Sequence, residues 1–235
     1  MAKVVPRQKK RSPRRGTNWV MIGGIVVVGV IALFALLFAS LQGQGTPTPT
    51  LAPVTALTDF CAANEVNCIE KGNPEAAVTV VEVSDYACIH CRNFNLDGTA
   101  EAIDEMYVES GRVQWIVLPY STNSSTRPAA EASFCAAEQD MFFEYHESMF
   151  GLFGTDSAYS RDGILSAAGG AGLDLDSFEA CLDAGNYTDT LQRNLSTAVG
   201  AGVRATPTFF INGRMVEGNL PLPNFQDELD RELGS

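Results

Sequence analysis

The two cysteines Cys88 and Cys91 are the residues of this sequence whose type and spacing could do chemistry. They lie in the stretch "SDYACIHCRNF", after the apolar run of residues 76–83 and before a segment with helical character. A sulfur at the start of a helix meets unpaired backbone N–H groups and the positive end of the helix dipole, which both favour a thiolate. We therefore expect a lowered pKa for Cys88, with Cys91 close enough to close a short disulfide with it. His90 between them can add positive charge and a hydrogen-bond donor near the sulfur.

The spacing of this pair is also compatible with a metal clip or with a structural disulfide. A structural metal site needs four ligands, and His146 is the only histidine besides His90. A strand followed by Cys-x-x-Cys and a helix, in an exported chain, favours a redox centre over both alternatives. We expect neither a metal nor a cofactor.

A second candidate feature is the Thr206-Pro207 dipeptide, which opens the apolar, β-prone stretch "TPTFFI". A proline that begins a central strand is poorly tolerated in a sheet unless the local geometry is unusual. A cis peptide bond is one solution, and it would leave the backbone of residue 206 free to pair with an extended substrate. From the spacing alone, a trans proline at the start of a strand is an equal alternative.

The elements around these residues follow the order β-α-β, a helical block, then β-β-α. Residues 89–110 are predicted to form one helix ended by Gly111, and residues 112–120 a strand parallel to the strand at 76–83. The apolar spacing from Cys135 to Phe153 predicts one amphipathic helix within a long region without strand signals. Asn212-Gly213 predicts a tight hairpin, and residues 223–233 a closing helix.

The N-terminal part of the sequence predicts a membrane anchor. A basic tail, residues 1–18, precedes the 23 uncharged apolar residues 19–41, which as a helix of about 35 Å could cross a bilayer. The positive-inside rule keeps this tail in the cytoplasm and exports the rest. A cleaved signal peptide is the alternative, but the run is long for one and no A-x-A site follows it. Residues 42–58, rich in Gly, Pro and Thr, predict a flexible linker.

The charge of the exported part argues against nucleic acid or anionic lipid as a partner. Seven of the 16 Lys and Arg residues lie in the basic tail. The exported part therefore contains the other nine together with all 28 acidic residues, and its formal charge is −19. Such a surface repels phosphates and favours solubility.

All six cysteines also lie beyond the predicted anchor, and an even number in an exported domain favours disulfides over free thiols. Cys61 and Cys68 bracket a short loop, where we expect a local disulfide. A second redox pair is the alternative there, but no strand–helix junction supports a thiolate at that place.

Three separated motifs, "VVEVSDYACIHCRNF", "CAAEQDMFFEYHESMF" and "GVRATPTFFING", resemble the DsbA-like thiol–disulfide oxidoreductases of the thioredoxin superfamily. The resemblance implies an α/β protein with a thioredoxin fold over residues 59–235, a helical insertion at about 127–200, and here a preceding transmembrane helix. One residue departs from the pattern: Ile89 stands where the family's prototype has proline, which leaves the redox potential open.

The same resemblance implies roles for individual residues. Cys88 would be the exposed nucleophile, Cys91 its buried partner, and Pro207 a cis-proline facing the disulfide. Glu82, in the strand before the motif, would accept the proton of Cys91, although an edge-facing strand carboxylate is the alternative. Thr206 and Ile89 are expected at the substrate-binding surface.

Relatives of this kind often pair two cysteines inside the helical insertion. The resemblance therefore implies a disulfide between Cys135 and Cys181, with two buried free cysteines as the alternative. A bridge over this span could contribute about 4 kcal/mol in the chain-entropy model.

The sequence thus predicts a monomeric, single-pass membrane protein with an extracytoplasmic catalytic domain that introduces disulfides into exported proteins with reduced cysteines. An integral membrane, quinone-linked partner, DsbB-like or VKOR-like, would reoxidise it. The same fold could run the chemistry as a reductase or isomerase, because direction depends on potential and partner. A non-enzymatic anchored binding or holdase module is a further alternative, in which the cysteines would be purely structural.

Overall fold

The computed structural model describes residues 56–63 and 67–234 of the chain. The predicted basic tail, the predicted membrane span at 19–41 and most of the predicted linker lie outside these residues. Within the described ranges, no helix combines the length and apolar character needed to cross a bilayer. The predicted linker, residues 42–58, extended too far toward the C-terminus, because helix α2 (Ala56–Ala63) already begins at Ala56.

A five-stranded mixed sheet forms the centre of the described part of the chain, with the strand order β1-β3-β2-β4-β5. In the sheet order, the strands are Ile69–Gly72, Val113–Pro119, Val78–Ser84, Thr208–Ile211 and Arg214–Glu217. The predicted parallel pairing of β2 with β3 is confirmed, and the other neighbours pair antiparallel. Strand β1 was not predicted from the sequence; it has only four residues, which lie at the edge of the sheet and alternate between half-buried and exposed.

The prediction of one continuous helix over residues 89–110 was wrong. The segment divides into α3 (Ile89–Leu96), α4 (Thr99–Ile103) and a π-helical stretch η1 (Asp104–Val108). Gly98 separates α3 from α4 with a left-handed φ of 88°, which glycine adopts without steric cost. The redox motif therefore belongs to a short helix of its own.

Five helices lie between β3 and β4 and make up the inserted helical region. They are α5 (Arg127–Ala137), α6 (Phe142–Gly151), α7 (Arg161–Ala171), α8 (Leu175–Ala184) and α9 (Thr188–Gly200). The single amphipathic helix predicted from Cys135 to Phe153 was wrong, because α5 and α6 are joined by a turn in which Asp140 has a φ of 58°. Its predicted apolar face is nevertheless largely buried, since Cys135, Tyr145 and Met149 lie in one core cluster.

The end of the chain follows the sequence expectation. Asn212 and Gly213 both have positive φ, 45° and 85°, as a tight hairpin between β4 and β5 requires. The Asn212 side chain also accepts a hydrogen bond from the backbone N–H of Thr79 at 2.9 Å and so ties the turn to β2. The closing helix α10 spans Leu222–Leu233.

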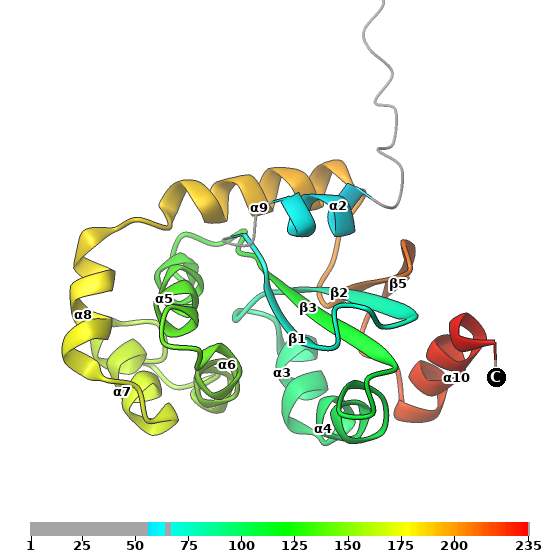
Figure 1. Ribbon diagram of the computed structural model, residues 1–235. Coiled ribbons are helices and arrows are strands. Elements are labelled where there is room, and N and C mark those ends of the chain that lie inside the picture. Colours follow the sequence, from blue (N-terminus) through cyan, green and yellow to red (C-terminus); the bar gives the residue numbers. More distant parts are fainter. Residues whose placement is uncertain (1–55, 64–66, 235) are drawn as a thin grey trace, which may run out of the picture. The chain divides into compact units, whose positions relative to one another are not determined.

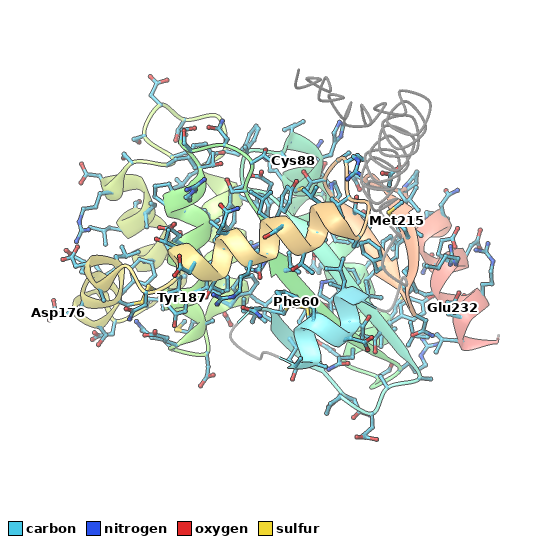
Figure 2. The ribbon with its side chains drawn as sticks, turned by 90° about the horizontal axis from the view of Figure 1, so that it is seen from above. Phe60, Cys88, Asp176, Tyr187, Met215 and Glu232 are labelled. Atoms are coloured by element: carbon cyan, nitrogen blue, oxygen red, sulfur yellow. A yellow bond between two sulfur atoms is a disulfide. The ribbon has the colours of Figure 1, made fainter. Side chains whose placement is uncertain are left out.

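Both faces of the sheet are covered by helices, because successive side chains of the central strands point to opposite sides. Val81 and Val83 of β2 pack in a cluster with Leu57 of α2 and Ala198 of α9. Figure 1 shows α2 and α9 on that side of the sheet, with α3, α4 and α10 on the other. In Figure 2, which looks down on α9, helices α2 and α9 run over the sheet beside each other.

The opposite face carries an aromatic core. Phe94 of α3 lies with its ring centroid 4.7 Å from Phe209 and 5.9 Å from Trp115. Phe225 of α10 packs on the same rings. This cluster fixes α3 against the sheet, so the first turn of α3 is held at the end of β2.

Candidate active site

Cys88 is the N-cap residue of α3, at the place where the chain leaves β2. Its φ and ψ of −95° and 116° are extended, and its Sγ accepts a hydrogen bond from the backbone N–H of Cys91 at 3.3 Å. This is the geometry of a helix cap with sulfur in the place of the usual side-chain oxygen. Both cysteines are free thiols in the structure, with Cys88 half-buried and Cys91 fully buried.

The surroundings of the pair separate the acidities of the two thiols. The hydrogen bond from the Cys91 side chain, assisted by Thr206 and by the backbone N–H groups of Cys91 and His90, lowers the pKa of Cys88 to about 5 against the opposing effect of burial. Burial, together with the hydrogen bond to Cys88 and the negative charge there, raises the pKa of Cys91. One sulfur is therefore an anion at neutral pH while the other holds its proton.

The side chains that flank the pair are exposed. Ile89 is 44% exposed, so its apolar side chain lies at the surface beside Cys88. His90 is exposed too, and among the described residues its imidazole has no hydrogen-bond partner. The backbone N–H of His90 contributes to the lowered pKa of Cys88. The predicted role of the His90 side chain stays a prediction.

The Thr206–Pro207 peptide bond is cis, and it lies directly beside Cys88 although 118 residues separate Cys88 from Thr206 in the sequence. As a thiol, Cys88 Sγ donates a hydrogen bond to the Thr206 carbonyl at 3.0 Å. Pro207 is buried and Thr206 half-buried. The structure thus brings together both features that the sequence analysis selected.

Glu82 occupies the middle of β2 and is only 1% exposed, so the alternative of an edge-facing carboxylate is wrong. Its Oε2 accepts a hydrogen bond from Trp115 Nε1 at 3.2 Å, and its Oε1 accepts one from Asn95 Nδ2 at 3.3 Å. Asn95 Nδ2 also donates to the backbone carbonyl of Cys91 at 2.9 Å, which links the carboxylate to the helix turn of the buried cysteine. Burial raises the pKa of Glu82 despite these hydrogen bonds.

A small cavity of about 20 Å³ lies next to this carboxylate, and Glu82, Asn95, Lys71 and His146 are among its lining residues. His146 is 5% exposed, and its Nδ1 lies 2.9 Å from the hydroxyl of Tyr86. Burial, with a smaller effect of the Lys71 charge, lowers the pKa of His146 to about 3, so its ring is neutral.

Several residues of the site escaped the sequence analysis. Asp85 and Tyr86 stand within the quoted motif and Asn95 directly follows it, but spacing alone does not show which of them point inward. Tyr86 packs with its ring centroid 5.0 Å from Phe150 of the helical insertion. The only available signal was their nearness to the cysteines in sequence.

The four remaining cysteines form two disulfides. Cys61 is bonded to Cys68 with an S–S distance of 2.06 Å, and Cys135 to Cys181 with 1.98 Å. The first joins α2 to the residue before β1, and the second joins α5 to α8. In the described part of the chain, no group of three or more His, Cys, Asp or Glu side chains is arranged to hold a metal ion.

Comparison with known proteins agrees with this arrangement. The sequence matches the thioredoxin family over residues 65–231. It is 23% identical over 168 residues to "Disulfide bond formation protein D" of Bacillus subtilis, covering 69% of this chain and 75% of that protein. The structure resembles oxidised BdbD from Bacillus subtilis with a TM-score of 0.62 and 22% sequence identity, over 71% of this chain and 92% of that one.

Another relative is much longer. The sequence is 31% identical over 149 residues to the Na(+)/H(+) antiporter NhaA of Herminiimonas arsenicoxydans, but the match covers 63% of this chain and only 23% of the antiporter.

The fold and the site together define a thioredoxin-fold protein with a redox-type cysteine pair at a strand–helix junction. The chain belongs to the thioredoxin family. Its fold is that of the DsbA-like disulfide oxidoreductases, and five helices lie between β3 and β4.

Proposed function

We propose that this chain is an extracytoplasmic thiol–disulfide oxidoreductase that introduces disulfides into exported proteins. The observation that carries the proposal is the asymmetry of the pair: Cys88 is half-exposed with a pKa of about 5, and Cys91 is buried with a raised pKa. A thiol with a stable anion stabilises the reduced form of the enzyme, and this makes its disulfide a strong oxidant.

The reaction would proceed in two exchanges. A client thiolate attacks the Cys88 sulfur of the disulfide, a mixed disulfide forms, and Cys91 leaves as a thiolate that takes up a proton. A second client thiolate then attacks the client sulfur of the mixed disulfide, and Cys88 leaves as a thiolate. Two electrons pass from the client to the enzyme. The low pKa makes Cys88 a good leaving group, which favours release of the oxidised client.

Glu82 is proposed to exchange the proton of Cys91. Burial raises the pKa of its carboxyl group, which favours the protonated form, and Asn95 connects it to the turn that carries the buried thiol. The 20 Å³ cavity beside it is large enough for about one water molecule, which could carry the proton over the remaining gap.

Client binding is proposed at the surface around Cys88. Ile89 offers an exposed apolar contact, and the backbone of Thr206 beside the sulfur offers pairing to an extended client segment. The residues 19–41 would anchor the domain to the outer face of the cell membrane, and an integral membrane quinone-linked partner, DsbB-like or VKOR-like, would reoxidise it. The Bacillus subtilis relative is a disulfide bond formation protein by name, which supports the oxidising direction.

Two measurements test the proposal. The wild-type disulfide should oxidise a reduced, unfolded test protein, and Cys88→Ser should abolish this activity while Cys61→Ala/Cys68→Ala, which leaves the redox pair untouched, should retain it. Titration of the Cys88–Cys91 pair against glutathione gives the potential. A value near that of DsbA supports an oxidase, whereas a value near that of thioredoxin would assign the chain to reduction or isomerisation. Full activity of Cys88→Ser would refute the enzymatic role.

A further inference from the structure

His146 of α6 is a buried histidine with one ring nitrogen left without a protein partner. Its side chain is 5% exposed, and its Nδ1 lies 2.9 Å from the hydroxyl of Tyr86. Its Nε2 is buried as well, and among the described residues it has no hydrogen-bond partner. Buried polar atoms are nearly always hydrogen-bonded, and an ordered water is a common partner where no protein group is in reach. The Nε2 atom therefore marks a place where a water would bind.

The cavity of about 20 Å³ beside Glu82 has the room for this water. His146 and Glu82 both line it, and because Nδ1 is taken up by Tyr86, Nε2 is the nitrogen left to face it. The two carboxyl oxygens of Glu82 each accept one hydrogen bond, from Trp115 and from Asn95, and each keeps a second acceptor position. One water in the cavity thus has partners on both sides, the imidazole of α6 and the carboxyl group of β2.

The imidazole is held in a fixed orientation by the rings around it. The ring centroids of Phe142, Phe150 and Tyr86 lie 5.1, 4.7 and 5.2 Å from that of His146. Tyr86 also decides which ring nitrogen carries the proton. Burial raises the pKa of Tyr86, so its hydroxyl keeps its proton and donates it to the acceptor at 2.9 Å, which is Nδ1. The tautomer that follows carries its own proton on Nε2 and offers a donor to the cavity.

The cavity lies beside an open groove of about 470 Å³. Lys71, Asp104, Phe143 and His146 are among the residues that line both spaces. The ammonium group of Lys71 is paired with Asp104 and lies 4.3 Å from the centre of the Phe143 ring. This ion pair is partly exposed, so a water in the cavity is separated from solvent by a single pair of side chains.

We propose that His146 is a positioning residue for proton transfer, whose Nε2–H holds one water against the carboxyl group of Glu82. This rests on the proposed thiol–disulfide exchange and on the role of Glu82 in it, but not on the direction of the exchange. When the disulfide is reduced, Cys91 gains one proton by way of Glu82, and the water exchanges a proton with that carboxyl group. The same proton leaves on reoxidation. His146 itself neither gains nor loses a proton, and the electrons pass only between the client and the two cysteines.

The first test determines the tautomer of His146 in the full-length wild-type protein. A long-range ¹H–¹⁵N NMR spectrum of the imidazole groups shows which ring nitrogen carries the proton. The chain has only two histidines, and the spectrum of His146→Gln assigns their signals. We expect a neutral ring at neutral pH with its proton on Nε2 in both redox states. A proton on Nδ1, or a charged ring, would overturn the proposal, and this measurement needs no folded variant.

The second test uses two variants that keep different parts of the imidazole. The amide nitrogen of His146→Gln can reach the position of Nε2, whereas that of His146→Asn reaches only the position of Nδ1. Reduction of the disulfide by dithiothreitol should be roughly tenfold slower in His146→Asn, the equivalent of one lost hydrogen bond, and should recover in His146→Gln. Urea unfolding of both variants controls for the fold. A histidine that only packs would give the two variants the same rate, and that result would contradict the proposal.

A double variant tests whether His146 acts through Glu82. Glu82→Gln removes the carboxyl group that the water serves, so adding His146→Asn to it should cause no further loss of rate. A further tenfold loss would show two independent effects and would refute the coupling. If Glu82→Gln is slow but His146→Asn is not, this proposal alone fails. If Glu82→Gln reacts at the wild-type rate, the proposed proton role of Glu82 fails with it, and full activity of Cys88→Ser is the separate result that removes the enzymatic function.

Discussion

Replacing Cys91 with alanine should raise the pKa of Cys88, because the side chain of Cys91 supplies the largest single stabilisation of the Cys88 anion. The hydrogen bond from the Cys91 thiol comes first among the groups that lower the pKa of Cys88 from 9.0 to about 5. In Cys91→Ala this donor is lost, while the backbone N–H of Cys91 at 3.3 Å and the helix start remain. The variant therefore separates the contribution of the thiol from that of the helix.

The size of the effect follows from the strength of a hydrogen bond to a charged group. Such a bond contributes about 1.5–3 kcal/mol, which corresponds to about 1–2 pH units in a pKa. The pKa of Cys88 should thus rise from about 5 in the wild type to about 6–7 in Cys91→Ala. At about pH 6 the anionic fraction would fall from roughly 90% to between roughly 10% and 50%.

The assay is a pH titration of the thiolate absorbance of Cys88, repeated as the pH dependence of alkylation by iodoacetamide. In the Cys91→Ala protein Cys88 is the only described free thiol, so the curve has one midpoint. Cys91→Ser is the matched control, since its hydroxyl can still donate, and its midpoint should lie between those of the wild type and the alanine variant. A midpoint near 5 in all three proteins would refute the assignment of the pKa to this hydrogen bond and leave the helix start as its cause.

Three further predictions follow from the site and its supports. Glu82→Gln should slow the reduction of the disulfide by dithiothreitol roughly a hundredfold, because Cys91 then leaves without a neighbouring proton donor; stopped-flow fluorescence measures the rate, and a wild-type rate would exclude the role. The double variant Cys135→Ala/Cys181→Ala should lose up to about 4 kcal/mol of unfolding free energy in urea, against about 2.5 kcal/mol for the smaller loop closed before β1; equal losses would contradict the loop-entropy argument. The pKa of Cys88 is about 5 in the folded protein and about 8.5 in the unfolded chain, so the Cys88 anion stabilises the reduced, folded protein. This stabilisation is complete above about pH 8.5 and is lost as the pH falls through about 5. Reduced protein should therefore lose stability relative to oxidised protein over that range in parallel urea titrations, and a constant difference would contradict the linkage.

The parts of the fold that were predictable are those with a strong local signal. The buried strand β2 is a nearly continuous run of β-branched residues, and the Asn212-Gly213 turn needs two residues that tolerate positive φ. A helix connects β2 to β3, and strands joined by such a crossover lie parallel in the sheet, so the parallel pairing of β2 and β3 could be predicted.

The misses have a physical cause as well. The short edge strand β1 has no apolar run that would predict a strand. It forms because its backbone pairs antiparallel with β3. The break at Asp140 lies inside a periodic apolar pattern, which continues across the turn because α5 and α6 bury their faces in the same cluster. Periodicity reports which residues are buried, but it does not report whether the backbone between them stays helical.

For the site, the sequence by itself determined the local chemistry: two cysteines lie one helical turn apart, and the first precedes the first turn of a helix, which places its sulfur among free N–H groups. Only the tertiary structure decided what surrounds them. In the folded protein the Thr206 carbonyl lies 3.0 Å from the Cys88 sulfur, although 118 residues separate the two in the sequence. Glu82 is buried in the sheet, and the Asp85 carboxylate accepts a hydrogen bond from the backbone of Ala87, directly before Cys88. The reason is that a helix start is a property of neighbouring residues, whereas burial and charge at a sulfur depend on groups that meet only when the sheet and its helices pack.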